Sequence, residues 1–180
     1  MNILLIILSV IVGIIALLLI IALFSKKDYS LFRSITINQP QQEVFNYVKL
    51  LRNQEKYSKW VMTDPTMKTN LTGTDGTVGF IYAWEGNKQA GKGEQEIKAI
   101  KEGERLDIEV RFIKPFEGIA STPFTTETVG DNQTKITWGM ISSMKYPMNI
   151  MLVFMNMEKM LGKDLEISLG NLKRILEEGK

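Results

Sequence analysis

The stretch MNIMLVFMNMEKMLGKDLEISLGNLKRILEE, residues 148–178, decides the fold, because it predicts one long amphipathic helix. Its second half carries leucines at spacings of four, four, three and four residues, which place them on one helix face. These leucines are Leu161, Leu165, Leu169, Leu172 and Leu176. The first half holds half of the ten methionines, namely Met148, Met151, Met155, Met157 and Met160. A leucine stripe of this length has to be buried, so the preceding chain must supply a surface that covers it.

The preceding chain offers that surface as short β-type segments separated by turn residues, which is the pattern of an antiparallel meander. The clearest segment is 105–114, in which Leu106, Ile108, Val110 and Phe112 alternate with polar residues. Such alternation predicts one buried face and one solvated face. The strand segments predicted in this way are 30–37, 66–72, 78–85, 91–100, 105–114, 119–129 and 135–144.

A short helix is predicted directly after the first strand. Pro40 suits the first helical position, and Val44, Val48 and Leu51 share one face. The order of strand, helix, six strands and long helix predicts an α+β domain, in which a curved antiparallel sheet wraps around the C-terminal helix. Glycines within strand segments predict bends or bulges in that sheet, at Gly79, Gly91 and Gly93.

The first residues of the chain predict a transmembrane helix. Residues 3–24 are apolar except for Ser9 and Gly13, and as a helix they span roughly 33 Å, enough for a bilayer core. The alternative is a cleaved signal peptide, which has a basic start, a shorter apolar run and a small-residue cleavage site. No Lys or Arg precedes the apolar run, so an uncleaved span is favoured. The predicted organisation is an anchor at 1–25, a short linker at 26–30 and one domain at 31–180.

The residues that flank the span predict its orientation. Lys26, Lys27 and Arg33 follow it, and only the amino terminus is basic before it. The positive-inside rule then predicts a single-pass protein of a bacterial inner or plasma membrane, with its C-terminal domain in the cytoplasm. The alternative is that Lys26 and Lys27 reach toward lipid headgroups on either side.

The composition narrows the possible functions. The chain has 180 residues, no His and no Cys, so the commonest general base and the commonest metal ligands are missing, and no metal site or cofactor is predicted. A net charge of +2 gives no electrostatic case for nucleic acid. The acidic residues of the strands could include a general acid, but their alternation with apolar residues favours solvated side chains: Glu85, Glu94, Glu96 and Asp107. The sequence contains no catalytic motif, so enzymatic activity is not predicted.

The order of the elements and several short motifs resemble the helix-grip fold of the START/Bet v 1-like superfamily, also called SRPBCC, and within it the polyketide cyclase/dehydrase-like group. The motifs are Val44-Phe45, Tyr47-Val48, Trp60, 79–87, 91–97, Glu104-Arg105-Leu106, Phe112, Pro115, 134–138, Leu169 and Leu172-Lys173. The resemblance covers roughly residues 30–178. It implies a hydrophobic ligand held between the sheet and the long helix, and it implies no catalytic residues.

The residues expected to line such a cavity are aromatic residues of the strands and methionines of the long helix. They are Trp84, Phe112, Phe124, Trp138, Met140, Met151 and Met155. Methionine suits adaptable apolar surfaces, but the same cluster could be ordinary core or could enter the membrane interface. Gly162 and Gly170 predict room for a ligand or close packing against the sheet.

These observations favour a membrane-tethered domain that binds a small hydrophobic or lipid-like molecule. Its expected partners are that ligand and the membrane, through residues 3–24. One alternative is a cyclase- or dehydratase-like enzyme that uses polar groups in the cavity, which would require an ionisable side chain that points inward. Another is a ligand-free module that binds a protein at the membrane.

Overall fold

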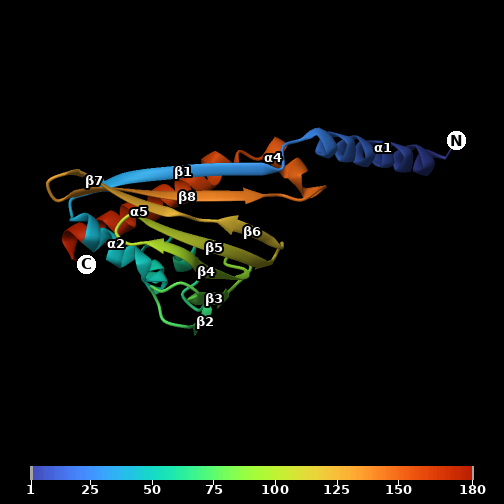
Figure 1. The fold of residues 1–180 in the computed structure, drawn as a ribbon. Coiled ribbons are helices and arrows are strands. Elements are labelled where there is room, and N and C mark those ends of the chain that lie inside the picture. The colour runs from blue at the N-terminus through green and yellow to red at the C-terminus, as the bar shows by residue number, and fades with distance from the viewer. Residues whose placement is uncertain (1, 180) are drawn as a thin grey trace.

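The computed structural model describes residues 2–179 as an α+β domain with one apolar helix at its amino end (Figure 1). The elements are α1 (Ile3–Phe24), β1 (Asp28–Ile37), α2 (Gln41–Lys49), η1 (Leu51–Asn53), α3 (Gln54–Tyr57), η2 (Val61–Thr63), β2 (Lys68–Thr72), β3 (Ile81–Glu85), β4 (Lys92–Lys101), β5 (Arg105–Lys114), β6 (Gly118–Ser121), β7 (Phe124–Gly130), β8 (Gln133–Ser143), η3 (Met148–Ile150), α4 (Met151–Phe154) and α5 (Met157–Glu178).

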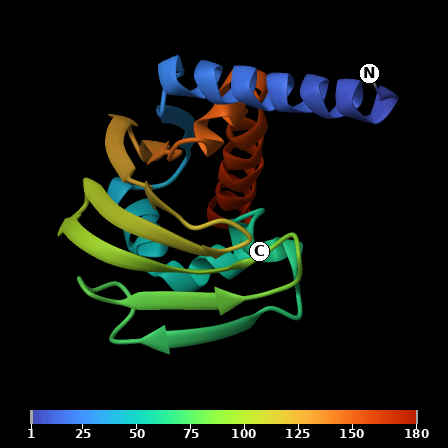
Figure 2. The same ribbon diagram turned by 90° about the vertical axis from the view of Figure 1, so that its right-hand side faces the viewer.

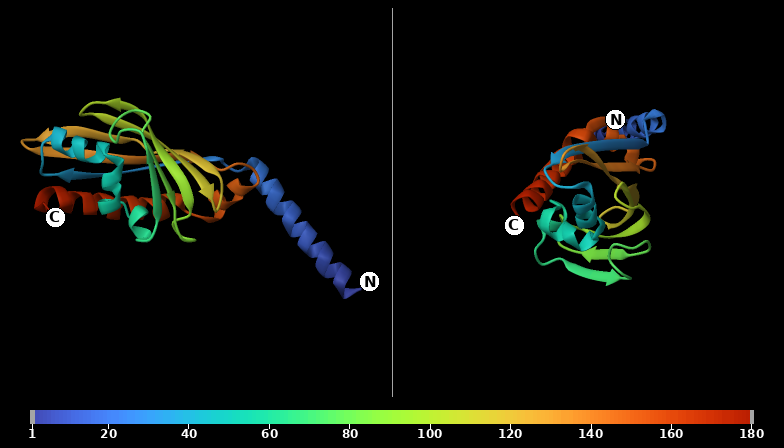
Figure 3. Two further views of the ribbon diagram at one scale, coloured as in Figure 1. Left: turned by 90° about the horizontal axis from the view of Figure 1, so that it is seen from below. Right: turned by 60° about the vertical axis from the view of Figure 1, so that its left-hand side comes forward.

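The eight strands form one antiparallel sheet, which confirms the predicted fold class. Its order is β1-β8-β6-β5-β4-β3-β2, and β7 pairs with both β5 and β8. The first strand pairs along its whole length with the last, from Asp28 opposite Ser143 to Ile37 opposite Thr134. The sheet curls strongly, and α2, α3 and α5 lie on its concave side (Figures 2 and 3). A bulge between Lys92 and Gly93 adds to the curl, as the strand glycines predict.

The core fills this concave side. Leu165, Leu169 and Leu172 of α5 are buried, and Leu161 and Leu176 pack at the two ends of the stripe. The predicted leucine face is therefore confirmed. It covers Leu31 and Ile37 of β1, with Val44, Phe45 and Val48 of α2 in the same core.

Two segments differ from their predicted form. The predicted strand 119–129 is two strands, β6 and β7, separated at Thr122-Pro123, because Pro123 has no N–H to donate to a strand ladder. The predicted long helix is broken at Met155, whose backbone is extended. Asn156 then begins α5, because its side chain accepts a hydrogen bond from the backbone N–H of Lys159 at 2.9 Å. Met148 and Met151 thus lie in η3 and α4, separate from the leucine stripe, whereas Met157 and Met160 lie in the first turn of α5.

The two glycines of α5 have different surroundings. The guanidinium group of Arg33 lies directly over Gly162 and donates to Glu166 at 2.6 Å, so Gly162 allows close packing against β1. Apart from its chain neighbours and the backbone of its own helix, no atom of residues 2–179 lies within 4 Å of where a side chain would begin at Gly170. The prediction of a packing or ligand role for Gly170 is therefore wrong.

Helix α1 projects from the end of the domain where β1 begins (Figures 1 and 3). Its 22 residues have a mean hydropathy of 3.5, so it is long and apolar enough to cross a bilayer. Its last turn contacts the domain: Ala22 is buried, and the amide of the buried Asn149 in η3 donates to the backbone oxygen of Ala22 at 2.7 Å. The strand β1 begins at Asp28, two residues before its predicted start.

Candidate ligand-binding site

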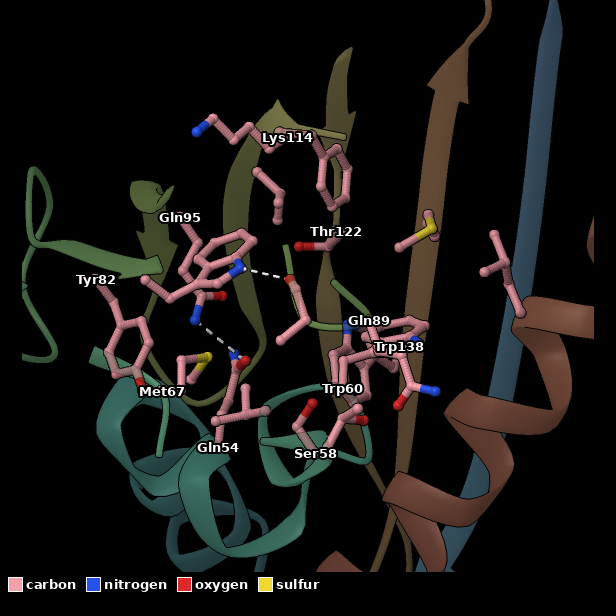
Figure 4. Close-up of a pocket in the computed structure, with 18 of the residues that line it drawn as sticks. Gln54, Ser58, Trp60, Met67, Tyr82, Gln89, Gln95, Lys114, Thr122 and Trp138 are labelled. Carbon is pink, nitrogen blue, oxygen red and sulfur yellow. Dashed lines mark hydrogen bonds between the residues drawn. The ribbon is translucent and has the colours of Figure 1, made fainter. Parts of the chain in front are cut away.

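A cavity of about 310 Å³ lies between the concave face of the sheet and the segment that runs from α3 to Met67 (Figure 4). Its sheet side comes from β3, β4, β5 and β8, with Tyr29 of β1 and with Gln89 and Ala90 of the β3–β4 turn. Its other side comes from residues 54–67, and Leu161 is the one lining residue from α5. The expectation that the long helix forms the opposite wall is therefore wrong for most of the cavity. The short helices after α2 form that wall.

Aromatic rings build one end of the cavity around Trp138. Trp138 belongs to the inward face of β8, with Ile136 and Met140, and its ring stacks on Phe124 with centroids 4.5 Å apart. Trp60 meets the same indole edge-on at 5.6 Å, and Tyr57 does so at 6.1 Å. These offset and edge-on contacts are the arrangements that aromatic pairs prefer. They fix Trp138 rigidly as one end of the cavity, which we call the floor.

A cross-strand row of Trp84, Gly93 and Phe112 forms the side wall. Trp84 lies opposite Gly93, and Gly93 lies opposite Phe112. A side chain at Gly93 would begin 2.7 Å from the Trp84 ring, so only glycine lets the indole lie across β4. The indole N–H of Trp84 donates to the backbone oxygen of Ala90 at 3.0 Å. Its hydrogen-bonding capacity is therefore used within the protein.

Two buried polar groups on the cavity wall have no hydrogen-bond partner among residues 2–179. They are the hydroxyl of Ser58 and the indole N–H of Trp138, and both lie at the floor in Figure 4. Beside them, the buried Gln54 and Gln95 pair with each other at 3.2 Å. A buried polar group without a partner costs about 1–3 kcal/mol, so most such groups in proteins are satisfied. Both unpaired groups lie just behind one end of the cavity, with Ser58 0% and Trp138 3% exposed, so a small shift of the wall would let a ligand accept hydrogen bonds from them.

Three of the cavity-lining residues within 2–179 are ionisable, namely Tyr29, Tyr82 and Lys114. Lys114 lies at the end opposite Ser58 and Trp138, where its side chain is exposed, and we call this end the mouth (Figure 4). The Tyr82 hydroxyl donates to Glu55 at 2.9 Å. Burial raises the pKa of Tyr82, and the hydrogen bond to Glu55 raises it further. No carboxylate occurs among the residues that line the cavity within 2–179.

The acidic residues of the strands lie on the outer face of the sheet instead. Glu94 and Glu96 both bind Arg111 at 2.7 Å, and Glu85 binds Lys92. Hydrogen bonds from Arg111 and then Lys98 hold the pKa of Glu96 below its usual range. The alternation of the sequence favoured solvated side chains for these acidic residues, and the ion pairs on the outer face agree with it.

The structure brings together four of the seven residues predicted to line a cavity: Trp84, Phe112, Trp138 and Met140. Phe124 lies behind Trp138 and supports it. Met151 and Met155 do not line this cavity, because the break before Asn156 directs their segment elsewhere, and Met155 lines a groove beside β1. Sequence reasoning missed Gln54, Ser58, Trp60, Tyr82 and Gln95. Gln95 could have been predicted, because the alternation of β4 places it on the inward face with the buried Ile97.

Comparison with known proteins defines the fold. No family model and no curated protein matches the sequence. Among solved structures, norcoclaurine synthase from Thalictrum flavum has a TM-score of 0.64 at 11% identity, covering 87% of this chain and 98% of its own. A protein from Chromobacterium violaceum has a TM-score of 0.59 at 12% identity, covering 82% and 96%. Ara h 8.0201 has a TM-score of 0.55 at 14% identity, covering 84% and 96%. The domain therefore has the helix-grip fold of Bet v 1-like proteins.

Proposed function

We propose that the domain binds a small, uncharged and mainly apolar molecule in its cavity, and that α1 tethers it to a membrane. One observation carries the proposal: an aromatic cavity ends at two buried hydrogen-bonding groups that have no partner within residues 2–179. A volume of about 310 Å³ is at the lower end of the range for small-molecule sites. The ligand is therefore small.

The floor of the cavity indicates the chemistry of the ligand. The indole N–H of Trp138 can only donate, and the Ser58 hydroxyl can donate or accept. An oxygen acceptor on the ligand, such as a carbonyl or hydroxyl, can accept a hydrogen bond from either group. A charged group there would lose its hydration without gaining an opposite charge, because Lys114 is at the mouth. We therefore propose a neutral ligand with an apolar body and one polar end that enters first.

A matched pair of ligands tests this proposal in the full-length chain in detergent micelles. A cyclic ketone and the hydrocarbon of the same ring are compared by thermal shift and calorimetry. We expect the ketone to bind roughly 10-fold or more tightly, because one well-placed hydrogen bond to an otherwise unpaired donor contributes about 1–3 kcal/mol. Trp138→Phe should remove this preference and leave the binding of the hydrocarbon nearly unchanged.

Trp60→Phe is the control for that variant. It also removes an indole N–H from the cavity wall, but this N–H already donates to Asp164 at 3.0 Å. The preference for the ketone should therefore survive in Trp60→Phe. Equal binding of ketone and hydrocarbon by the unchanged protein would refute the polar anchor, and no binding of any apolar probe would refute the binding function.

The cavity offers less support for cyclase or dehydratase chemistry. Such an enzyme needs an acid–base group close to the substrate. The Tyr82 hydroxyl is bonded to Glu55, and Lys114 is exposed at the mouth. Binding is therefore the function that the geometry supports best.

The proposed tether keeps the domain at the membrane surface. We propose that the positive charges of Lys26 and Lys27 hold this end of α1, and the domain with it, on the cytoplasmic side. Protease treatment of sealed spheroplasts tests this orientation. The domain should stay intact until the membrane is opened, and its digestion in sealed spheroplasts would reverse the assignment.

A further inference from the structure

The tether and the cavity mouth lie at the same end of the sheet. The strand β1 begins where β8 ends, and β6 pairs with this same end of β8, with Ala120 opposite Ser142. The strand β5 ends there as well, with Lys114 opposite Lys92. The turn from β5 to β6, the mouth residue Lys114, the end of α1 and α4 therefore share one end of the domain (Figure 1). We call this the tether end.

The tether end exposes large apolar side chains. Phe154 and Val153 of α4 are 69% and 52% exposed, and Phe116 in the β5–β6 turn is 65% exposed. No residue of α4 is buried. Tyr146 and Met148, just before α4, are also exposed. Large apolar side chains that are exposed together at one end of a small domain mark a surface that another molecule covers when the protein functions.

The charges around this cluster favour an anionic lipid surface. Lys26, Lys27, Lys145 and Lys159 are exposed beside it, and the sequence has no Asp or Glu between residues 132 and 157. The nearby acidic residues are fewer, namely Asp28, Glu117 and Glu158. At the opposite end of the sheet, Glu102 and Glu104 form ion pairs with Lys49 and Lys101, so the lysines there are balanced by acidic partners. Apolar side chains rimmed by lysine are the pattern of segments that lie in a membrane interface.

Hydrogen bonds fix the position of the cluster along the axis of α1. The buried amide of Asn149 donates to the backbone oxygens of Ala22 and Ser25, at 2.7 and 3.3 Å. These two residues are at the end of the apolar helix, where a spanning helix leaves the hydrocarbon core. The helix α4 begins two residues after Asn149. It therefore lies at the depth of the lipid headgroups if α1 spans the bilayer.

We infer that the tether end docks on the bilayer, with Phe154 and Val153 of α4 and Phe116 of the β5–β6 turn inserted into an anionic lipid interface. The cavity mouth then opens at the membrane surface, so that an apolar ligand passes between bilayer and cavity without crossing water. This inference rests on the proposed tether. It does not require any particular ligand.

Single-cysteine labelling tests the docking directly, because the natural chain has no cysteine. Nitroxide labels are placed by Phe154→Cys and Phe116→Cys in the full-length protein, reconstituted in phosphatidylcholine–phosphatidylglycerol vesicles. Val12→Cys in α1 reports the hydrocarbon core. Val129→Cys is the matched control, because Val129 is a 49% exposed apolar residue at the opposite end of the sheet. Collision rates with oxygen, which concentrates in lipid, and with a water-soluble nickel chelate are compared.

The docking predicts that labels at 154 and 116 collide mainly with oxygen and several times less with nickel than the label at 129. If the label at 12 is in lipid but those at 154 and 116 are as accessible to nickel as the label at 129, the docking is overturned and the tether stands. If the label at 12 is as accessible to nickel as a label in water, both the docking and the tether are overturned. Binding of the ketone probe is measured separately, so neither result depends on the proposed ligand.

Discussion

Ser58 is the residue at which the proposed binding and the stability of the fold oppose each other. Its hydroxyl is buried beside the cavity without a partner among residues 2–179, which is unfavourable for folding. Ser58→Ala should therefore raise the free energy of unfolding, by about 1 kcal/mol, and weaken binding of the ketone probe. Chemical denaturation of the full-length protein in micelles measures the first effect.

Ser168→Ala is the control for this variant. Ser168 is equally buried, but its hydroxyl accepts from the backbone N–H of Lys59 at 2.9 Å and donates to the backbone oxygen of Asp164 at 2.8 Å. Its removal should lower the free energy of unfolding by about 1 kcal/mol or more, since two partners lose a bond. Equal destabilisation by both variants would show that the Ser58 hydroxyl has a partner after all.

Asp64 gives the stability of the fold a dependence on pH. Its carboxylate accepts from the hydroxyl and the N–H of Thr66, and from the N–H of Asn87 at 2.7 Å, which ties the β3–β4 turn to the opposite wall. The hydrogen bond from the Thr66 side chain, followed by those from the two backbone N–H groups, lowers the pKa of Asp64 from its ordinary value of 3.8.

Because the folded-state pKa is the lower one, the carboxylate of Asp64 stabilises the fold fully above the ordinary value. This contribution decreases as the pH falls below about 3.8 and is lost below the folded-state pKa. Asp64→Asn should therefore lower the melting temperature at neutral pH, with the difference from the unchanged protein shrinking in acid. A difference that is constant from pH 7 down to pH ~2 would contradict this role.

The residues of the site were predictable where a strand carries them. The alternation of β8 gives Trp138 and Met140 an inward direction, and that of β5 does the same for Phe112. Ser58 and Trp60 lie on an irregular turn between short helices, whose side-chain directions follow no sequence period. The unpaired state of the Ser58 hydroxyl depends on groups distant in sequence, so no local pattern could reveal it.

At the scale of elements, the two glycines of α5 test how the helix contacts β1. Gly170→Ala should raise the free energy of unfolding by about 1 kcal/mol, because alanine favours helix and meets no neighbour there. Gly162→Ala has the same helical preference but displaces the Arg33 guanidinium from its contacts with Glu158 and Glu166. Its free energy of unfolding should increase less than that of Gly170→Ala, or should decrease. Chemical denaturation of both variants checks this, and an equal gain would contradict the close contact.

The break before α5 explains which part of the sequence prediction failed. Residues 148–160 consist mostly of good helix formers, so periodicity predicts a continuous helix. The break depends on local chemistry at Asn156, which caps α5, and on the contact between Asn149 and the end of α1. Met151 and Met155 therefore do not line the cavity as expected. For their segment we propose the membrane interface, which Phe154 and Val153 of α4 enter.

At the scale of the whole molecule, the curved sheet and the leucine stripe determine each other. The stripe needs a concave apolar surface, and the inward residues of eight strands supply it, so composition and periodicity were enough to predict the fold. They were not enough for the cavity, which exists where the core is incompletely filled. Its position depends on how residues 54–67 pack across the sheet, and such packing has no signature in sequence.

The central claim is that this cavity holds a small, neutral, apolar molecule. The most direct measurement is native mass spectrometry of the full-length protein, extracted from the membrane in mild detergent and released from micelles in the spectrometer. We predict a mass above that of the chain, from one small neutral compound, and loss of this compound from Trp138→Phe but not from Trp60→Phe. The bare chain mass in all three proteins, with no apolar compound in solvent extracts, would contradict the claim.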